Sequence, residues 1–324
     1  MNAHMLSRRR FLSAAGLTAA GLARAPLFAG PGKAAATPKR KFYVVLSLGR
    51  IGFEGSFRQS VELANQYAFE GVDPDPEYFA ALSDADLKKV LEDLKARNLK
   101  LGAAGLPVEF REDEAAFNEG LRKLPAAAKV LQRAGVSRVS TWIMPCSDDL
   151  TYLQNFRQHA CRLRACAQVL KDHGLRLGLE YVGPRTLWRS KRHPFLHTLS
   201  EMKELLVAMG MDNLGVQLDS FHWFNAEESE DDLRTLRSQD AITVDLNDAP
   251  QVPLDQQIDG KRELPAATGV IPVKKFLAAL LEIGYDGPIQ AEPFNAALRA
   301  LPLEQACAAT AAAMRKALGE LGTA

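Results

Sequence analysis

Gly174-Leu-Arg-Leu-Gly-Leu-Glu180 begins with a turn residue, continues as a short apolar run and ends on a carboxylate. Gly284-Tyr-Asp-Gly-Pro-Ile-Gln-Ala-Glu292 follows the same plan later in the chain. A short apolar run that follows a turn is typical of a strand buried on both faces of a parallel sheet. We therefore predict a buried strand at each of these segments.

Short apolar or β-branched runs alternate with longer amphipathic ones along the chain after residue 37, with no break in composition. The short runs predict strands at residues 42–47, 71–73, 101–106, 138–144, 175–181, 214–219, 241–246 and 288–292. The long runs predict helices at residues 57–67, 83–97, 114–134, 153–173, 199–209, 230–237, 272–283 and 303–318. Strict alternation indicates a parallel sheet. Eight such units predict an α/β fold, a closed (β/α)8 TIM barrel over residues 37–324.

An open, doubly wound sheet is the alternative fold. Such a sheet usually carries a glycine-rich phosphate-binding loop after an early strand. Leu48-Gly-Arg-Ile-Gly52 is the nearest candidate, but it lacks the third glycine and a helix start at the right place. We therefore expect no nucleotide-binding loop there.

Residues 1–36 differ from the rest of the chain, because they contain five Lys or Arg side chains and no acid. They include Ser7-Arg-Arg-Arg-Phe-Leu12, then a weakly apolar run, then Ala, Pro and Gly. This order is typical of a signal peptide, and the first segment resembles the twin-arginine export signal. The apolar run is about half the roughly 20 residues of a membrane-spanning helix, so we expect no stable membrane anchor. We predict a twin-arginine signal peptide and linker at residues 1–36 and a periplasmic or extracytoplasmic protein, with a disordered basic arm as the alternative.

The charge balance excludes several partners. The chain has 40 Lys and Arg against 39 Asp and Glu, and 47% of its residues are hydrophobic. Without residues 1–36 the balance becomes 35 against 39, a net charge of −4. A folded domain of this charge is not expected to bind nucleic acid. Four cysteines are too few for a disulfide scaffold in a chain of this length.

Four predicted strands in succession end at or near a carboxylate, namely Glu180, Asp219, Asp245 and Glu292. The carboxyl ends of barrel strands share one rim, where active sites of this fold lie. Like charges that meet there need a cation, a proton or a basic ligand to coexist. Oxygen donors suit Mg, Mn or Ca. We predict a divalent metal site, with a metal-free carboxylate cluster as the alternative.

The segments around these acids also resemble a known family. They are Gly178-Leu-Glu180, Leu218-Asp-Ser-Phe-His222, Val244-Asp-Leu-Asn-Asp248 and Ala291-Glu-Pro-Phe294. In this order and spacing they resemble the xylose isomerase-like barrels, the group of sugar phosphate isomerases and epimerases. Ketose 3-epimerases, inosose dehydratases and endonuclease IV share that fold. The resemblance extends from about Lys41 to Gly319.

The resemblance implies roles for single residues. Glu180 and Glu292 match two glutamates that bind the metal and act as acid and base across the sugar. Asp219 matches a metal ligand, and His222 matches a histidine that contacts the substrate. Arg262 matches an arginine that reaches a substrate hydroxyl or phosphate.

Asp245 departs from the family pattern, because the family usually has a histidine ligand there. The predicted metal set is therefore Glu180, Asp219, Asp245 and Glu292, with four formal negative charges. We expect a divalent cation, Mn, Mg or Co, and Zn is less favoured by a set of oxygen donors. The departure leaves open a protein that has lost the metal or performs different chemistry.

Two tryptophans, Trp188 and Trp223, lie in the segments after the fifth and sixth predicted strands. Tryptophans at a rim often stack on sugar faces, so we predict that both contact the substrate. Burial of either side chain as a plug in its loop is the alternative.

The expected activity is a metal-dependent isomerase or epimerase that acts on a sugar or keto-sugar. Proton transfer next to a carbonyl passes through an enediolate and needs a base and a stabilised oxygen. The same enolate can expel a hydroxyl, so a lyase or hydratase on an oxidised sugar or cyclitol is the alternative. A non-catalytic sugar-binding barrel is a further one. We expect a small sugar as partner, and a homo-oligomer is compatible with the sequence.

Overall fold

The structure is a computed structural model that describes residues 39–321. Within them, nine strands form one sheet in the order β3-β2-β1-β11-β10-β9-β7-β5-β4, and all of its pairings are parallel. The strands are β1 (Tyr43–Leu46), β2 (Gly71–Val72), β3 (Lys100–Leu101), β4 (Ala104–Gly105), β5 (Arg138–Trp142), β7 (Arg176–Glu180), β9 (Leu214–Asp219), β10 (Ala241–Leu246) and β11 (Pro288–Ala291). The predicted export signal, residues 1–36, lies outside the described residues.

The two ends of this sheet, β3 and β4, are consecutive in the chain with two residues between them. β3 pairs with β2, while β4 pairs with β5. The predicted third strand, residues 101–106, is therefore a single strand position that is split in two. The curled sheet therefore has eight strand positions in an α/β barrel fold, as the sequence predicts.

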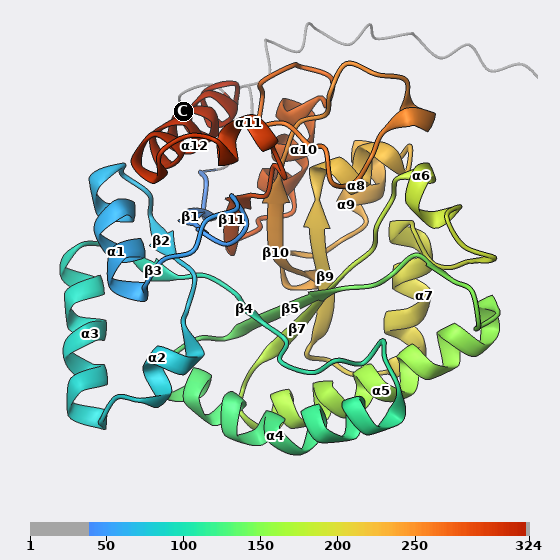
Figure 1. The fold of residues 1–324 in the computed structure, drawn as a ribbon, viewed down its shortest axis with the longest axis horizontal. Helices are drawn as coiled ribbons and strands as arrows, with labels where there is room; N and C mark the ends of the chain where they lie inside the picture. The colour runs from blue at the N-terminus through green and yellow to red at the C-terminus, as the bar shows by residue number, and fades with distance from the viewer. Residues whose placement is uncertain (1–38, 322–324) are drawn as a thin grey trace, which may run out of the picture. The chain divides into compact units, whose positions relative to one another are not determined.

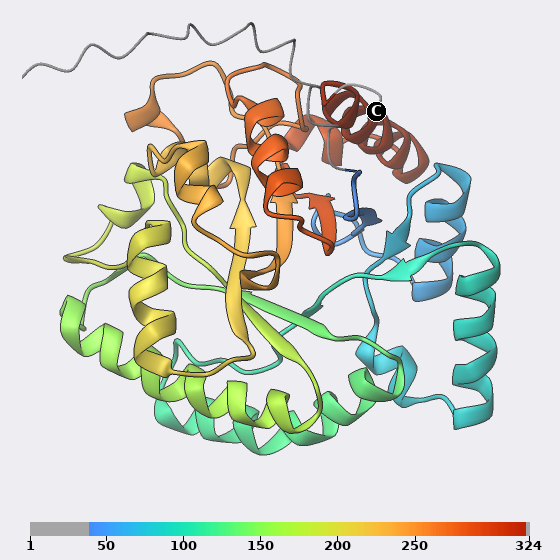
Figure 2. The same cartoon turned by 180° about the vertical axis from the view of Figure 1, so that it is seen from behind.

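The helices lie outside the strands, and the chain runs strand to helix around the barrel (Figure 1). Figure 2 shows the same arrangement from behind, with the neighbouring helices α4 and α5 along one edge. The helices are α1 (Phe57–Gln66), α2 (Pro76–Ala80), α3 (Asp84–Ala96), α4 (Glu114–Arg133), α5 (Tyr152–Asp172), α6 (Arg185–Trp188), α7 (Leu199–Met209), α8 (Ser220–Asn225), α9 (Glu230–Arg234), α10 (Val273–Glu282), α11 (Ala296–Arg299) and α12 (Leu303–Gly319). Over residues 39–321 we find no helix with the length and apolarity needed to traverse a bilayer.

The long predicted helices are present, and local chemistry explains where they begin. The Ser56 side chain accepts a hydrogen bond from the Gln59 amide at the start of α1, and Ser83 caps α3 in the same way. The sequence pattern did not predict the short helices α2, α6, α8 and α11 or the antiparallel pair of β6 (Cys146–Ser147) and β8 (His193–Pro194). These elements are too short to show a hydrophobic period.

Gly178, within the segment Gly174–Glu180, is explained by packing. Gly178 lies in β7, and a Cβ atom there would come within 2.8 Å of Ile242 Cβ. Gly215 in β9 has the same relation to Ile242, whose Cδ1 atom would lie 2.9 Å from an added Cβ. Two glycines on neighbouring strands therefore make room for one fully buried isoleucine inside the barrel.

Candidate active site

Four carboxylates gather where β7, β9, β10 and β11 end. They belong to Glu180, Asp219, Asp245 and Glu292, and one oxygen of each lies within 4.8 Å of the others. The strand register explains this, because Asp245 pairs with Asp219 on one side and with Gln290 on the other. The structure thus brings together all four predicted acids, while their roles as ligands or catalysts stay predictions.

A cavity of about 550 Å³ reaches two of these carboxylates, those of Glu180 and Glu292. Its lining includes Glu180, Glu292, Arg50, Arg111 and Trp142. This volume is ordinary for a small-molecule site. A larger cavity of about 750 Å³ beside α4 is lined mostly by apolar residues and contains none of the four carboxylates, so the smaller cavity is the candidate active site.

Asp219 is completely buried, and both of its oxygens accept hydrogen bonds from the protein. The Asn247 side-chain amide donates to both oxygens at 3.1 Å, and the Phe221 backbone amide donates to Oδ1 at 2.6 Å. The side-chain oxygen Oδ1 of Asn247 in turn accepts a hydrogen bond from the Glu292 backbone amide at 2.9 Å. Asn247 therefore fixes the ends of β9 and β11 relative to each other.

Arg262 lies in the segment after β10, and its guanidinium reaches into this cluster. Its Nη1 atom donates to Asp219 Oδ2 at 2.7 Å and to Glu292 Oε2 at 2.8 Å. Its Nη2 atom donates to Asp259 at 2.7 Å and to His222 Nε2 at 3.2 Å. The side chain is only 2% exposed. Its nitrogen atoms therefore already have protein partners, and the contact of Arg262 with a substrate oxygen stays a prediction.

Arg50 also reaches into the cluster, from the turn after β1. Its Nη1 atom donates to Asp245 Oδ2 at 2.8 Å and to Glu292 Oε1 at 2.7 Å. The Gln217 side-chain amide donates to the same Asp245 oxygen at 2.6 Å. The turn depends on Gly52, whose φ of 90° is rarely adopted by other residues. The fold thus places a second guanidinium between two of the predicted metal ligands.

Glu180 differs from the other three acids, because within residues 39–321 no Lys or Arg forms an ion pair with it. Its side chain is buried, and Oε1 accepts no hydrogen bond. Burial raises the pKa of Glu180 well above its ordinary value, and the nearby carboxylates of Glu292 and Asp245 raise it further. Burial also raises the pKa of Asp245 to about 7, although Arg50 opposes the shift.

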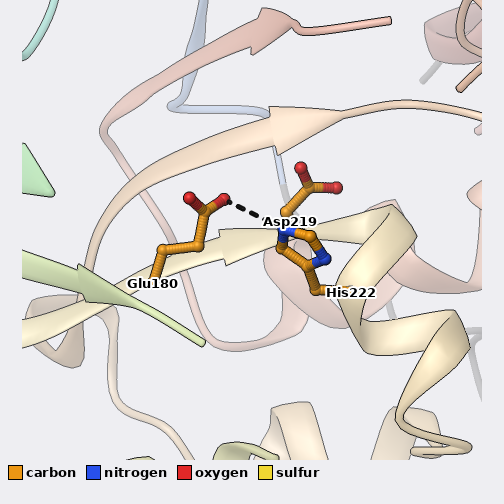
Figure 3. Close-up of side chains that lie close together, drawn as sticks. All are labelled: Glu180, Asp219 and His222. Atoms are coloured by element: carbon orange, nitrogen blue, oxygen red, sulfur yellow. Dashed lines mark ion pairs between the residues drawn. The ribbon is translucent and has the colours of Figure 1, made fainter. Parts of the chain in front are cut away.

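The His222 imidazole faces Glu180, as Figure 3 shows. Nε2 lies 3.8 Å from Glu180 Oε1, which is too long for a hydrogen bond. Because an arginine only donates, Nε2 must accept from Arg262, and the imidazole proton then sits on Nδ1. Burial lowers the pKa of His222 to about 3, which agrees with a neutral ring. His222 is therefore an uncharged neighbour of Glu180, and its contact with the substrate stays a prediction.

The two predicted tryptophans, Trp188 and Trp223, do not line the carboxylate cavity. Trp223 is 2% exposed, its indole N–H donates to the Ser229 carbonyl, and its ring packs against Phe276. Trp223 is therefore buried within its own loop, which is the alternative that the sequence left open. Trp188 stacks on the His197 ring, with centroids 4.4 Å apart, and does not line the carboxylate cavity.

A different tryptophan, Trp142, lines the cavity. It ends β5, pairs in register with Glu180 and is 43% exposed. The Arg111 guanidinium lies 4.4 Å from its ring centroid. The sequence analysis did not select Trp142. Its position near the end of the fourth predicted strand, on the same rim as the four acids, is the feature that could have identified it.

The fit of a divalent cation can be tested on the oxygens of the cluster. Their number and chemistry suit a cation, and the four residues could hold one. However, both oxygens of Asp219 and both of Glu292 are already bonded to protein donors. Of the four carboxylates, only Glu180 Oε1 and Asp245 Oδ1 are buried without a partner, and a metal site takes roughly four or more ligands. As arranged, the cluster does not fit a cation, so the predicted metal and its identity stay predictions.

Known proteins resemble the chain over most of its length. The profile of a family described as xylose isomerase-like TIM barrel matches residues 61–317. An inosose isomerase of Bacillus velezensis is 23% identical over 248 residues, which cover 74% of this chain and 84% of that protein. A 3-dehydroshikimate dehydratase of Pseudomonas putida is 26% identical over 269 residues, or 80% of this chain but 39% of that protein.

Solved structures agree on the fold. A xylose isomerase domain protein from Alicyclobacillus acidocaldarius superposes with a TM-score of 0.75 at 30% identity, over 87% of this chain and all of that one. The IOLI protein, whose crystal structure contains a bound zinc atom, superposes with a TM-score of 0.71 at 20% identity, over 87% of this chain and all of that one.

Proposed function

The chain belongs to the xylose isomerase-like TIM barrel family, and from this premise we propose that it is an isomerase or epimerase of a sugar, keto-sugar or cyclitol. The observation that carries the proposal is the cavity in which Glu180 and Glu292 meet, with oxygens within 4.8 Å of each other. One of these carboxyl groups, that of Glu180, has an oxygen without a protein partner. The activities of the relatives, an inosose isomerase and a 3-dehydroshikimate dehydratase, support this class of reaction.

Glu180 is the group that we propose to move the proton. Its unpartnered Oε1 is free to accept a proton from a carbon next to a carbonyl, and burial keeps its pKa high enough to hold the proton. Glu292 is a weaker base, because each of its oxygens accepts a charged hydrogen bond from an arginine. One carboxyl group that takes a proton from one carbon and returns it to the next is sufficient for isomerisation.

A divalent metal, predicted from the sequence, would supply positive charge to the enediolate oxygen. This mechanism assigns no step to it, because Arg50 and Arg262 hold three of the four predicted ligands.

Solvent deuterium tests the proposal. Keto-sugars and keto-cyclitols are incubated with the protein in D2O, and NMR follows the C–H signal next to the carbonyl. We expect exchange with the wild-type protein and a loss of about 10²–10⁴-fold in the Glu180→Gln variant. Glu92→Gln, on the exposed face of α3, is the matched control and should exchange like wild type. Absence of exchange with every substrate, or undiminished exchange in Glu180→Gln, would contradict the proposal.

Dehydration is the second candidate, and the single free carboxyl group favours it specifically. Glu180 can take the proton from carbon and deliver it to a departing hydroxyl on the same face. A product lighter than its substrate by about 18 Da in mass spectrometry identifies this reaction. An unchanged mass with a moved carbonyl identifies the isomerase.

We also propose that residues 1–36 direct export by the twin-arginine route. The support is the segment Ser7-Arg-Arg-Arg-Phe-Leu12 and the absence of acids around it. An exported enzyme would meet free or oxidised sugars more often than phosphorylated ones. Cell fractionation tests this, and an Arg8→Lys, Arg9→Lys double variant should accumulate in the cytoplasm.

A further inference from the structure

Two guanidinium groups bridge the carboxylates in pairs, as a metal ion would. Arg50 Nη1 joins Asp245 to Glu292 at 2.8 and 2.7 Å. Arg262 Nη1 joins Asp219 to Glu292 at 2.7 and 2.8 Å. Glu292 therefore has a different arginine on each oxygen. A divalent ion among these oxygens would lie close to both guanidinium groups, and like charges at that distance repel strongly in a buried site.

Both arginines are built into the fold. Arg262 lies between two aromatic rings, with Cζ 5.3 Å from the Phe221 centroid and 4.5 Å from the Phe294 centroid. Arg50 sits in a turn whose backbone closes through a hydrogen bond of 2.9 Å from the Phe53 amide to the Leu48 carbonyl. Arg262 is thus enclosed by the protein, and the side chain of Arg50 is held by the carboxylates of Asp245 and Glu292.

Arg50 and Arg262 differ in how many of their guanidinium N–H groups lack a protein partner. Nε and both Nη atoms of Arg262 have protein partners. Arg50 uses only Nη1 toward the residues that the structure describes, and its side chain remains 22% exposed in the cavity that Glu180 lines. The other N–H groups of Arg50 are therefore available to an oxygen of a bound molecule.

We propose that Arg50 and Arg262 take the place of a divalent cation in this site and that Arg50 is a catalytic residue, which stabilises the enediolate oxygen. This inference rests on the proposed function. Asp245 fits the same view, because the aspartate that stands in place of the family's histidine is the partner of Arg50. The pair Arg50 and Asp245 replaces a metal and its ligand.

The reaction then balances without a co-reactant. Glu180 takes the proton from a hydroxyl-bearing carbon, and the C–H electron pair forms a C=C bond to the carbonyl carbon. The carbonyl π pair moves to its oxygen, whose negative charge the Arg50 N–H groups bind. Glu180 returns its proton to the former carbonyl carbon, while the hydroxyl proton moves to the oxyanion. A carbonyl is left on the neighbouring carbon, and nothing has been oxidised or reduced overall.

Metal content tests the inference independently of turnover. The full-length protein is purified without chelators, its metals are measured by mass spectrometry, and Mn²⁺, Co²⁺ and Zn²⁺ are titrated by calorimetry. We expect sub-stoichiometric metal and no binding that depends on Asp219. About one equivalent of metal that is lost in an Asp219→Asn variant would overturn the inference, whether or not a substrate has been found.

A double variant tests the inference through a gain of metal binding. Arg50→Met with Asp245→His removes one guanidinium and restores the histidine that the family resemblance implies. We expect it to gain a site for Co²⁺ or Zn²⁺, whereas Arg122→Met, an exposed arginine of α4, should bind neither ion. If wild type and double variant bind these ions equally well, the inference is wrong.

Activity gives the second readout. We expect Arg50→Ala to lower turnover by about 10²–10³-fold and added guanidinium ion to restore part of it. Rescue by guanidinium distinguishes a catalytic charge from a structural role. Loss of wild-type turnover with a chelator would contradict the inference while leaving the proposed reaction intact. Absence of proton exchange in the wild-type protein both without metal and after addition of Mn²⁺, Co²⁺ or Zn²⁺ would instead contradict the proposed function.

Discussion

Glu180 and Glu292 end two strands of one barrel, yet their surroundings are opposite. Glu180 has a neutral histidine beside it and one oxygen without a partner. Glu292 has an arginine on each oxygen, and its backbone amide is held by Asn247. The carboxyl groups are chemically identical, so the difference comes from the neighbours that the fold supplies. A free buried carboxyl group can exchange a proton, whereas one held by two cations is a fixed charge.

This comparison predicts which glutamate turnover depends on most. Glu180→Gln keeps the shape of the side chain but removes its capacity to accept a proton, so we expect kcat to fall by about 10²–10⁴-fold. The melting temperature should hardly change, because no ion pair is lost. Steady-state kinetics and thermal unfolding on the same preparation check this. An equal loss of kcat in Glu180→Gln and Glu292→Gln would remove the distinction.

Glu292→Gln should act mainly on stability. It leaves Arg50 and Arg262 short of a shared counter-charge in a mostly buried site, and we expect about 3 kcal/mol of lost stability. Urea unfolding measures it. Glu282→Gln breaks an exposed pair with Arg234 and serves as the matched control, with an expected loss of about 1 kcal/mol or less. Similar losses in both variants would show that the buried network contributes little.

Ionisation of Glu180 should affect the activity and the stability of the protein in opposite directions as the pH changes. Because burial raises the pKa of Glu180, the folded protein holds its proton to a higher pH than the unfolded chain does. The base form, and with it kcat/KM, is therefore lost as the pH falls through a value above the ordinary range. The stability that this group contributes is present below its unfolded pKa and is lost as the pH rises. Opposite slopes of activity and stability in mildly acidic buffer are the expected result, and parallel slopes would count against Glu180 as the base.

The smallest expected effect concerns Trp142, which lines the cavity beside Glu180. Trp142→Ala should raise KM by roughly fivefold, since an aromatic contact contributes about 1 kcal/mol. Trp188→Ala should leave KM unchanged, because that ring packs on His197 outside the cavity. Initial rates give the KM of both variants. A raised KM in Trp188→Ala with an unchanged KM in Trp142→Ala would show that Trp188, and not Trp142, contacts the substrate.

The strand ends could be predicted from the sequence because they follow from hydrophobic period and turn residues. Four acids placed at successive strand ends must meet in a barrel, whatever the details of packing. The neighbours could not be predicted in this way. Arg50 lies in Leu48–Gly52, a segment that the sequence analysis considered only as a phosphate-binding loop and rejected, and its contact with Asp245 depends on how the barrel brings β1 and β10 together. Asn247 is a buried polar residue whose partners come from other strands.

The split of the third strand has a consequence for how the molecule moves. The backbone pairing changes within a few residues from β2 to β5, so the barrel has a seam with short ladders on both sides. Short ladders open more easily than long ones, and amide hydrogens there should exchange with solvent sooner than those of β9 and β10. Gly105 and Leu106, at the seam, also line the cavity. We therefore expect the part of the cavity wall at Gly105 and Leu106 to open more often than the strands that carry the four carboxylates.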